Sequence, residues 1–75
     1  MEAYLKTKEI NEIRGLLVRH GITKAVIYKQ RENPAFVTCD PSGIWHITAQ
    51  KDGSFKDWLI RFDTVISGFL EQQKI

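Results

Sequence analysis

Apolar residues near the start of the chain recur at helical spacing. The pattern comprises Ile10, Ile13, Leu16 and Leu17, which are three or four residues apart. This spacing places them along one side of an α-helix. Gly21 suits the position just after the helix, where a positive φ angle favours glycine, and Ile22 follows as its apolar contact. We therefore predict an amphipathic first helix that ends near residue 20.

A second and wider apolar stripe occupies the last third of the chain. Ser54 precedes it, and a serine hydroxyl commonly caps the first turn of a helix. The stripe consists of Phe55, Trp58, Leu59, Phe62, Val65, Ile66, Phe69 and Leu70. It covers about five helical turns at 3.6 residues per turn. We predict a second amphipathic helix here, longer than the first.

Between the helices lie three short runs rich in β-branched and aromatic residues, at 24–30, 35–39 and 44–50. Polar breaks at 31–34 and 40–43 separate them, and both contain proline, which is typical of turns. Two successive hairpins would give an antiparallel sheet. The predicted fold is therefore α+β, with a three-stranded antiparallel sheet, two helices packed on one face, and the order α-β-β-β-α.

The register of these hairpins follows if each turn is symmetric. Ile27 then lies opposite Val37, and Val37 lies opposite Ile47. Because side chains alternate across a strand, one set of residues shares a face. That set is small and apolar and should receive both helices: Ala25, Ile27, Ala35, Val37, Cys39, Trp45, Ile47 and Ala49. Cys39 is expected to pack beneath the helices beside Trp45.

The opposite face of the sheet has no helix left to cover it. Its central residues are Val26, Tyr28, Phe36, Thr38, His46 and Thr48. The register places Tyr28 opposite Phe36, so two aromatic rings would meet on an exposed surface. Apolar patches of this kind often mark interaction sites. The alternative is that an open antiparallel sheet tolerates such residues on its wet face. We interpret the face as a partner-binding surface.

Composition limits the class of protein. The chain has 75 residues, of which 43% are hydrophobic and 27% charged, so we expect one globular domain over 1–75. The single cysteine excludes an internal disulfide and a cysteine-rich zinc site, which favours a cytoplasmic location. No apolar run reaches the length of a membrane span. We therefore expect neither membrane insertion nor a bound metal.

Charge leaves a second hypothesis open. The net charge is +2, and the first half of the chain is the more basic. A nucleic-acid-binding surface would use Lys6, Lys8, Arg14, Arg19, Lys24, Lys29 and Arg31 to contact phosphates. Glu9, Glu12 and Glu32 interrupt this series, which weakens the hypothesis.

Catalytic chemistry has little support. His46 lies within the third run, but no carboxylate adjacent in sequence orients it as a general base. His20 is explained by its place at the negative end of the first helix. Turns and helix caps account for Asp40, Asp52 and Asp57. Neither a phosphate-binding loop nor a nucleophile elbow is present. We predict a non-enzymatic protein without a cofactor.

The predicted order of elements resembles that of double-stranded-RNA-binding domains and of several small mRNA-cleaving toxins. The resemblance is one of topology alone. The second helix opens with Ser54-Phe55-Lys56-Asp57-Trp58 instead of a basic cluster, and the glycine-serine-histidine strand entry of the toxins is absent. The sequence therefore predicts a small binding or regulatory protein that uses its open sheet face, with another protein or a second copy as partner. The alternative is a nucleic-acid-binding module.

Overall fold

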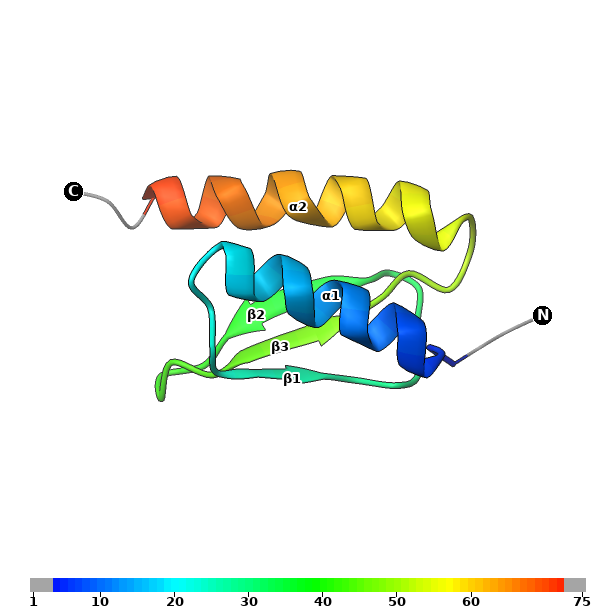
Figure 1. Cartoon of the computed structure of the whole chain (residues 1–75), viewed down its shortest axis with the longest axis horizontal. Coiled ribbons are helices and arrows are strands. Elements are labelled where there is room, and N and C mark those ends of the chain that lie inside the picture. The colour runs from blue at the N-terminus through cyan, green and yellow to red at the C-terminus, as the bar shows by residue number, and fades with distance from the viewer. Residues whose placement is uncertain (1–3, 73–75) are drawn as a thin grey trace.

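The computed structural model describes residues 4–72, which form two helices and three strands (Figure 1). In chain order these are α1 (Thr7–Arg19), β1 (Ala25–Ile27), β2 (Phe36–Cys39), β3 (Trp45–Thr48) and α2 (Phe55–Gln72). The α+β class, the α-β-β-β-α order and both amphipathic helices are therefore confirmed.

The end of α1 has the predicted geometry. Gly21 has a φ angle of 80°, a conformation that a side chain would oppose. Its amide donates to the carbonyl of Val18 at 2.9 Å, and the amide of Ile22 donates to that of Leu17 at 2.9 Å. These two bonds satisfy carbonyls that the helix leaves unpaired. Ile22 is buried, so the same motif also anchors the chain as it turns toward the sheet.

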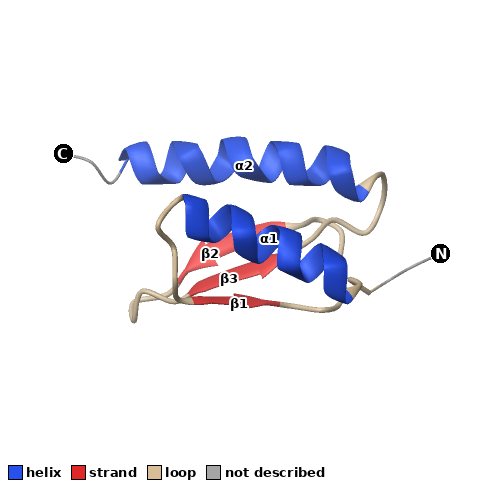
Figure 2. Cartoon of the chain, in the orientation of Figure 1, coloured by secondary structure: helices blue, strands red, loops and turns tan. Residues whose placement is uncertain are grey.

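The sheet is mixed, with β3 between the other two strands (Figure 2). The second predicted hairpin is confirmed, because β2 and β3 are antiparallel with Val37 opposite Ile47 and Cys39 opposite Trp45. The first predicted hairpin is wrong. Instead, β1 runs parallel to β3, which pairs Ile27 with Ile47. The sheet is consequently not fully antiparallel.

The segment 28–35 explains this difference. It does not form a tight turn, because the chain continues alongside β3 and makes a parallel bridge between Glu32 and Gln50. The chain then passes the end of β3 to its other edge, where it enters β2. Arg31 fixes this crossing segment: its Nε donates to the carbonyl of Gln50 at 2.8 Å, and its Nη2 donates to that of Gly53 at 3.4 Å. As a result, β3 lies at the centre of the sheet. It is also the strand with the largest number of buried residues, including Ile47.

The predicted face assignment holds although the strand order differs, because alternation along a strand does not depend on which strand lies beside it. The core joins Trp45, Ile47 and Ala49 to buried residues from both helices, which are Ile13, Leu16, Leu17, Trp58, Phe62 and Ile66. Both helices therefore pack on this side of the sheet. None of the helices within residues 4–72 is long and apolar enough to cross a membrane.

Cys39 departs from its predicted environment. It lies opposite Trp45 as expected, but it is exposed instead of packed in the core. The reason is that β2 is an edge strand, so none of the described strands lies along its outer side.

Candidate functional site

The open face of the sheet carries exposed large apolar side chains. Val26 and Tyr28 are each 42% exposed and Phe36 is 44% exposed. These three residues come from β1, the segment that follows it, and β2. They lie on the side of the sheet opposite the helical core, as predicted from alternation. Folding therefore leaves exposed apolar side chains on both sides of β3.

Tyr28 and Phe36 do not meet as the predicted hairpin implied. They lie on opposite sides of β3, because Phe36 pairs with Thr48 and the Tyr28 amide donates to the Ile47 carbonyl at 3.0 Å. Thr48 is only 2% exposed, so it forms the floor between the two rings. A hollow of about 400 Å³ results, lined by Tyr28, Gln30, Glu32, Phe36, Thr38, His46 and Thr48.

A chain of hydrogen bonds crosses this face and orients Tyr28. The Tyr28 hydroxyl lies 2.9 Å from His46 Nδ1, and His46 Nε2 lies 3.0 Å from Asp40 Oδ2. A carboxylate can only accept, so Nε2 carries a proton. In the neutral imidazole, Nδ1 then accepts the proton of the Tyr28 hydroxyl. The two rings also stack, with centroids 6.0 Å apart and planes 21° apart.

Asp40 connects this chain to the hairpin turn. Its Oδ1 accepts the amides of Ser42 at 2.9 Å and Ile44 at 3.0 Å, while its Oδ2 faces His46. The hydrogen bond from His46 lowers the pKa of the Asp40 carboxyl below its ordinary value, and the bonds from the Ile44 and Ser42 amides act in the same direction. Asp40 is therefore held as a carboxylate that fixes the imidazole ring.

Sequence reasoning gave Asp40 a role in the turn and missed its contact with His46. The signal was present in the hairpin register. Asp40 has the same parity as Thr38 and therefore the same face, where it lies diagonal to His46 across the strand pair. Gln30 and Glu32 also line the hollow. Alternation placed Gln30 at the edge of this face, whereas Glu32 was assigned to a turn and was missed.

This arrangement fixes the Tyr28, His46 and Asp40 side chains relative to one another. Both imidazole nitrogens of His46 already have partners, so the ring presents no free nitrogen toward the hollow. Among residues 4–72, His, Cys, Asp and Glu side chains form no group of three able to hold a metal ion.

The basic residues of the alternative hypothesis are scattered. Arg31 is only 8% exposed and bonds backbone carbonyls, so its guanidinium is unavailable to phosphates. On α1, Glu12 lies one turn after Lys8 and two turns before Arg19 on the same side of the helix, which breaks that row of charge. The others are exposed and distributed over α1 and the two ends of β1, at Lys6, Arg14, Lys24 and Lys29.

Comparison of the chain with protein-family models, with curated proteins and with solved structures gives no match.

Proposed function

We propose that this protein is a non-catalytic binding or regulatory module that recognises a protein partner through the open face of its sheet. The observation that carries the proposal is the hollow over Thr48, with Tyr28 and Phe36 as its walls. Aromatic side chains that are exposed around a concavity are typical anchors of protein interfaces. A single apolar side chain of the partner would enter the hollow and contact both rings.

The hydrogen-bond chain supports this proposal because it restrains one of the two walls before binding. Tyr28 is held by His46, which is itself held by Asp40. A side chain that is ordered in advance loses less conformational entropy when the partner binds. Gln30, Glu32 and Thr38 give the hollow a polar rim, which is the usual surrounding of an apolar interface centre.

The double variant Tyr28→Ala with Phe36→Ser tests the proposal. Loss of both walls should reduce partner binding by about a hundredfold or more, since interface anchors contribute roughly 2 kcal/mol or more each. The fold should persist, because both side chains lie outside the helical core. Binding is measured by capture from a nuclease-treated native lysate on the tagged protein, with quantification of the partners that wild type retains.

Val18→Ser is the matched control, since Val18 is a large exposed apolar residue on α1. It should leave capture unchanged. Tyr28→Phe separates the ring from the hydroxyl: it keeps the wall and removes the link to His46, so most binding should remain. A folded double variant that captures the same partners as wild type would contradict the proposal.

The nucleic-acid alternative has less support and is not advanced as a second function. Arg31 is buried, and Glu12 interrupts the basic side of α1. Phosphate recognition depends on several cations acting on one surface, and neither Lys nor Arg is among the described residues that line the hollow.

A further inference from the structure

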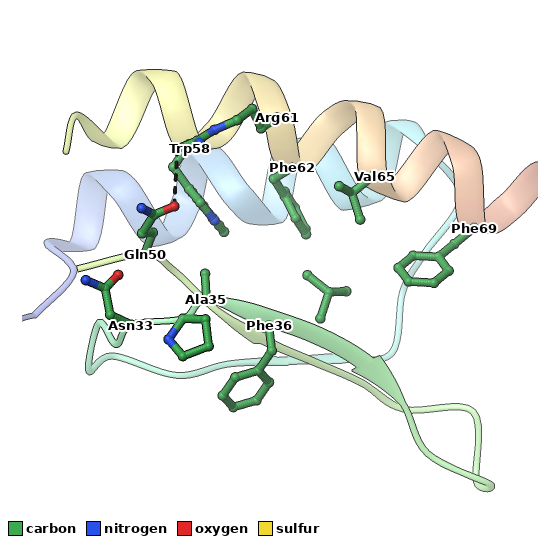
Figure 3. Close-up of a pocket in the computed structure, with 11 residues that line it drawn as sticks. Asn33, Ala35, Phe36, Gln50, Trp58, Arg61, Phe62, Val65 and Phe69 are labelled. Carbon is green, nitrogen blue, oxygen red and sulfur yellow. Dashed lines mark hydrogen bonds between the residues drawn. The ribbon is translucent and has the colours of Figure 1, made fainter. Parts of the chain in front are cut away.

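A larger apolar groove lies between α2 and the free edge of β2. Its volume is about 900 Å³, within the range of ligand-binding pockets. Ala35 and Val37 line it from the sheet. Phe62, Val65 and Phe69 project toward it from α2 (Figure 3). Small side chains below and large ones above leave a gap that opens at the sheet edge. This groove shares Phe36 with the hollow on the open face, but none of its other lining residues.

The free edge of β2 offers unpaired backbone groups next to this groove. The Asp40 amide donates to the carbonyl of Ile44 at 3.0 Å. Antiparallel pairs alternate between bonded and non-bonded, so Phe36 and Thr38 bond toward β3. Val37 and Cys39 therefore direct their N–H and C=O groups away from β3, where none of the described strands lies. Proteins usually protect such an edge with charged side chains, but Phe36–Cys39 contains none.

The groove matches the length of a short strand. The Phe69 ring lies 6.0 Å from that of Trp45, the partner of Cys39 in the sheet, so the C-terminal half of α2 lies over the Cys39 end of β2. Arg61 bonds Gln50 beyond the opposite end, through Nη2 and Oε1 at 3.2 Å. From Arg61 to Phe69 the helix rises about 12 Å, and four strand residues span about 13 Å.

Charge distinguishes the two ends of the groove. Of the described residues that line it, Arg61 alone is charged. Its guanidinium has five N–H donors and gives one to Gln50. An acidic group at this end would gain a charge-assisted hydrogen bond, whereas the Phe69 end is apolar. The preferred occupant is therefore apolar along its length and acidic at the Arg61 end.

We propose that β2 and α2 form a docking site for an extended segment of another protein, which adds to the sheet as a strand antiparallel to β2. Such a segment would pair its backbone with Val37 and Cys39. It would also place two large apolar side chains, two residues apart, beneath Phe62, Val65 and Phe69. A carboxylate at its C-terminal end would lie beside Arg61. Addition of a strand to an exposed sheet edge is a common mode of peptide recognition.

The probe is the synthetic peptide Lys-Thr-Leu-Thr-Phe-Thr-Asp, in which Leu, Phe and Asp alternate onto the groove side. A companion set replaces Leu and Phe each by Val, Ile, Tyr or Trp. We expect saturable binding by fluorescence anisotropy, and hydrogen exchange slowed about tenfold or more at the amides of Val37 and Cys39.

Methylating the Leu and Phe amides of the peptide should abolish binding, whereas methylating the Thr amides should not, because those face away from β2.

Two exposed apolar residues of α2 provide a matched pair of variants. Val65→Asp should weaken peptide binding about tenfold or more, since it brings a charge into the groove. Ile60→Asp should not, because Ile60 is 68% exposed and does not line the groove. Arg61→Gln should weaken binding of the Asp peptide about two- to fivefold, the range for an exposed ion pair, and leave an Asn peptide unaffected.

Three results would overturn the proposal. The first is that no peptide of the set binds wild type. The second is binding that is insensitive to methylation of the Leu and Phe amides, which would indicate an apolar groove without strand pairing. The third is a wild-type dimer that Val65→Asp converts to a monomer, which would make a second copy the occupant. Phe36 lines both sites, so the single variant Tyr28→Ala, which alters the hollow and not the groove, distinguishes failure here from failure of the proposed function.

Discussion

Thr48 and Arg31 are the polar residues that the fold buries within residues 4–72. Thr48 alternates onto the open face, yet Tyr28 and Phe36 on either side of β3 remove it from solvent. Arg31 is buried because the crossing segment passes beside the loop after β3, whose carbonyls accept its N–H groups. In both cases burial is set by neighbours that are distant in sequence, and residue type alone favours exposure.

Asp40 supports a prediction about pH. Its pKa is lowered in the folded protein from an ordinary value of 3.8, chiefly by the hydrogen bond to His46. Folding therefore favours the carboxylate, and the resulting stability is fully present above the unfolded-state pKa and lost as pH falls through the folded-state pKa. Asp40→Asn should lower the melting temperature at neutral pH, and the difference from wild type should shrink as pH falls from about 5 toward about 2.

His46→Ala provides the control for this experiment, because it removes the largest cause of the shift. In that background, the effect of Asp40→Asn and its dependence on pH should both be smaller. An effect of equal size at every pH, in either background, would show that the Asp40 carboxylate does not stabilise the fold through His46.

At the scale of elements, the apolar stripes predicted both helices correctly. The apolar runs of the strands did not predict the pairing of β1. Each helix buries the residues of its predicted stripe that face the sheet, including Ile13 on α1 and Phe62 and Ile66 on α2. Helical spacing is a local property, so it predicts the buried side directly. Pairing of β1 is non-local: it depends on whether segment 28–35 turns back or continues along β3.

Phe62 tests the packing of α2. It is buried and stacks on Trp58, with ring centroids 5.0 Å apart. Phe62→Ala should lower the free energy of unfolding by about 3–5 kcal/mol, the usual cost of deleting a buried aromatic side chain. Chemical denaturation followed by tryptophan fluorescence measures it. Ile60→Ala, on the exposed side of the same helix, should stay within about 0.5 kcal/mol of wild type. Equal stability of Phe62→Ala and wild type would show that α2 does not pack as described.

At the scale of the whole molecule, both helices pack on one side of the sheet, and a side-chain contact joins them. His20 Nε2, at the end of α1, lies 2.6 Å from Asp63 Oδ1 on α2. This contact adds a long-range role to a residue whose sequence position indicated only a helix terminus. The packing of both helices on one side leaves two apolar surfaces uncovered, the open sheet face and the groove at the edge of β2, which are the surfaces that we propose for partners. Neither coincides with the basic residues of α1.

The distribution of charge predicts weak interaction with nucleic acids. At about 50 mM salt we expect no retention of single- or double-stranded DNA or RNA in a filter-binding or gel-shift assay, because too few cations act together. Retention that falls steeply between about 50 and 200 mM salt, and that Arg14→Glu or Lys24→Glu weakens, would instead support the nucleic-acid hypothesis.

The sequence by itself determined the local features of this protein. Spacing of apolar residues predicted both helices, Gly21 predicted the end of the first, and the turn at 40–43 predicted the hairpin of β2 and β3 with its register. Alternation assigned strand residues to the correct face, and most of the hollow's residues were named in advance. All of these depend on interactions within a few residues of each other, or within a single strand.

Tertiary structure alone decided the order of the strands and everything that follows from it. Each residue of β1 faces the same side of the sheet whether β1 pairs with β3 or with β2. Alternation therefore could not distinguish these two pairings. The choice separates Tyr28 from Phe36, places Thr48 between them, and makes β2 an edge strand on which Cys39 is exposed. The physical reason is that strand neighbours are chosen by competition among distant segments for burial, and that competition is not expressed in the local pattern of any one segment.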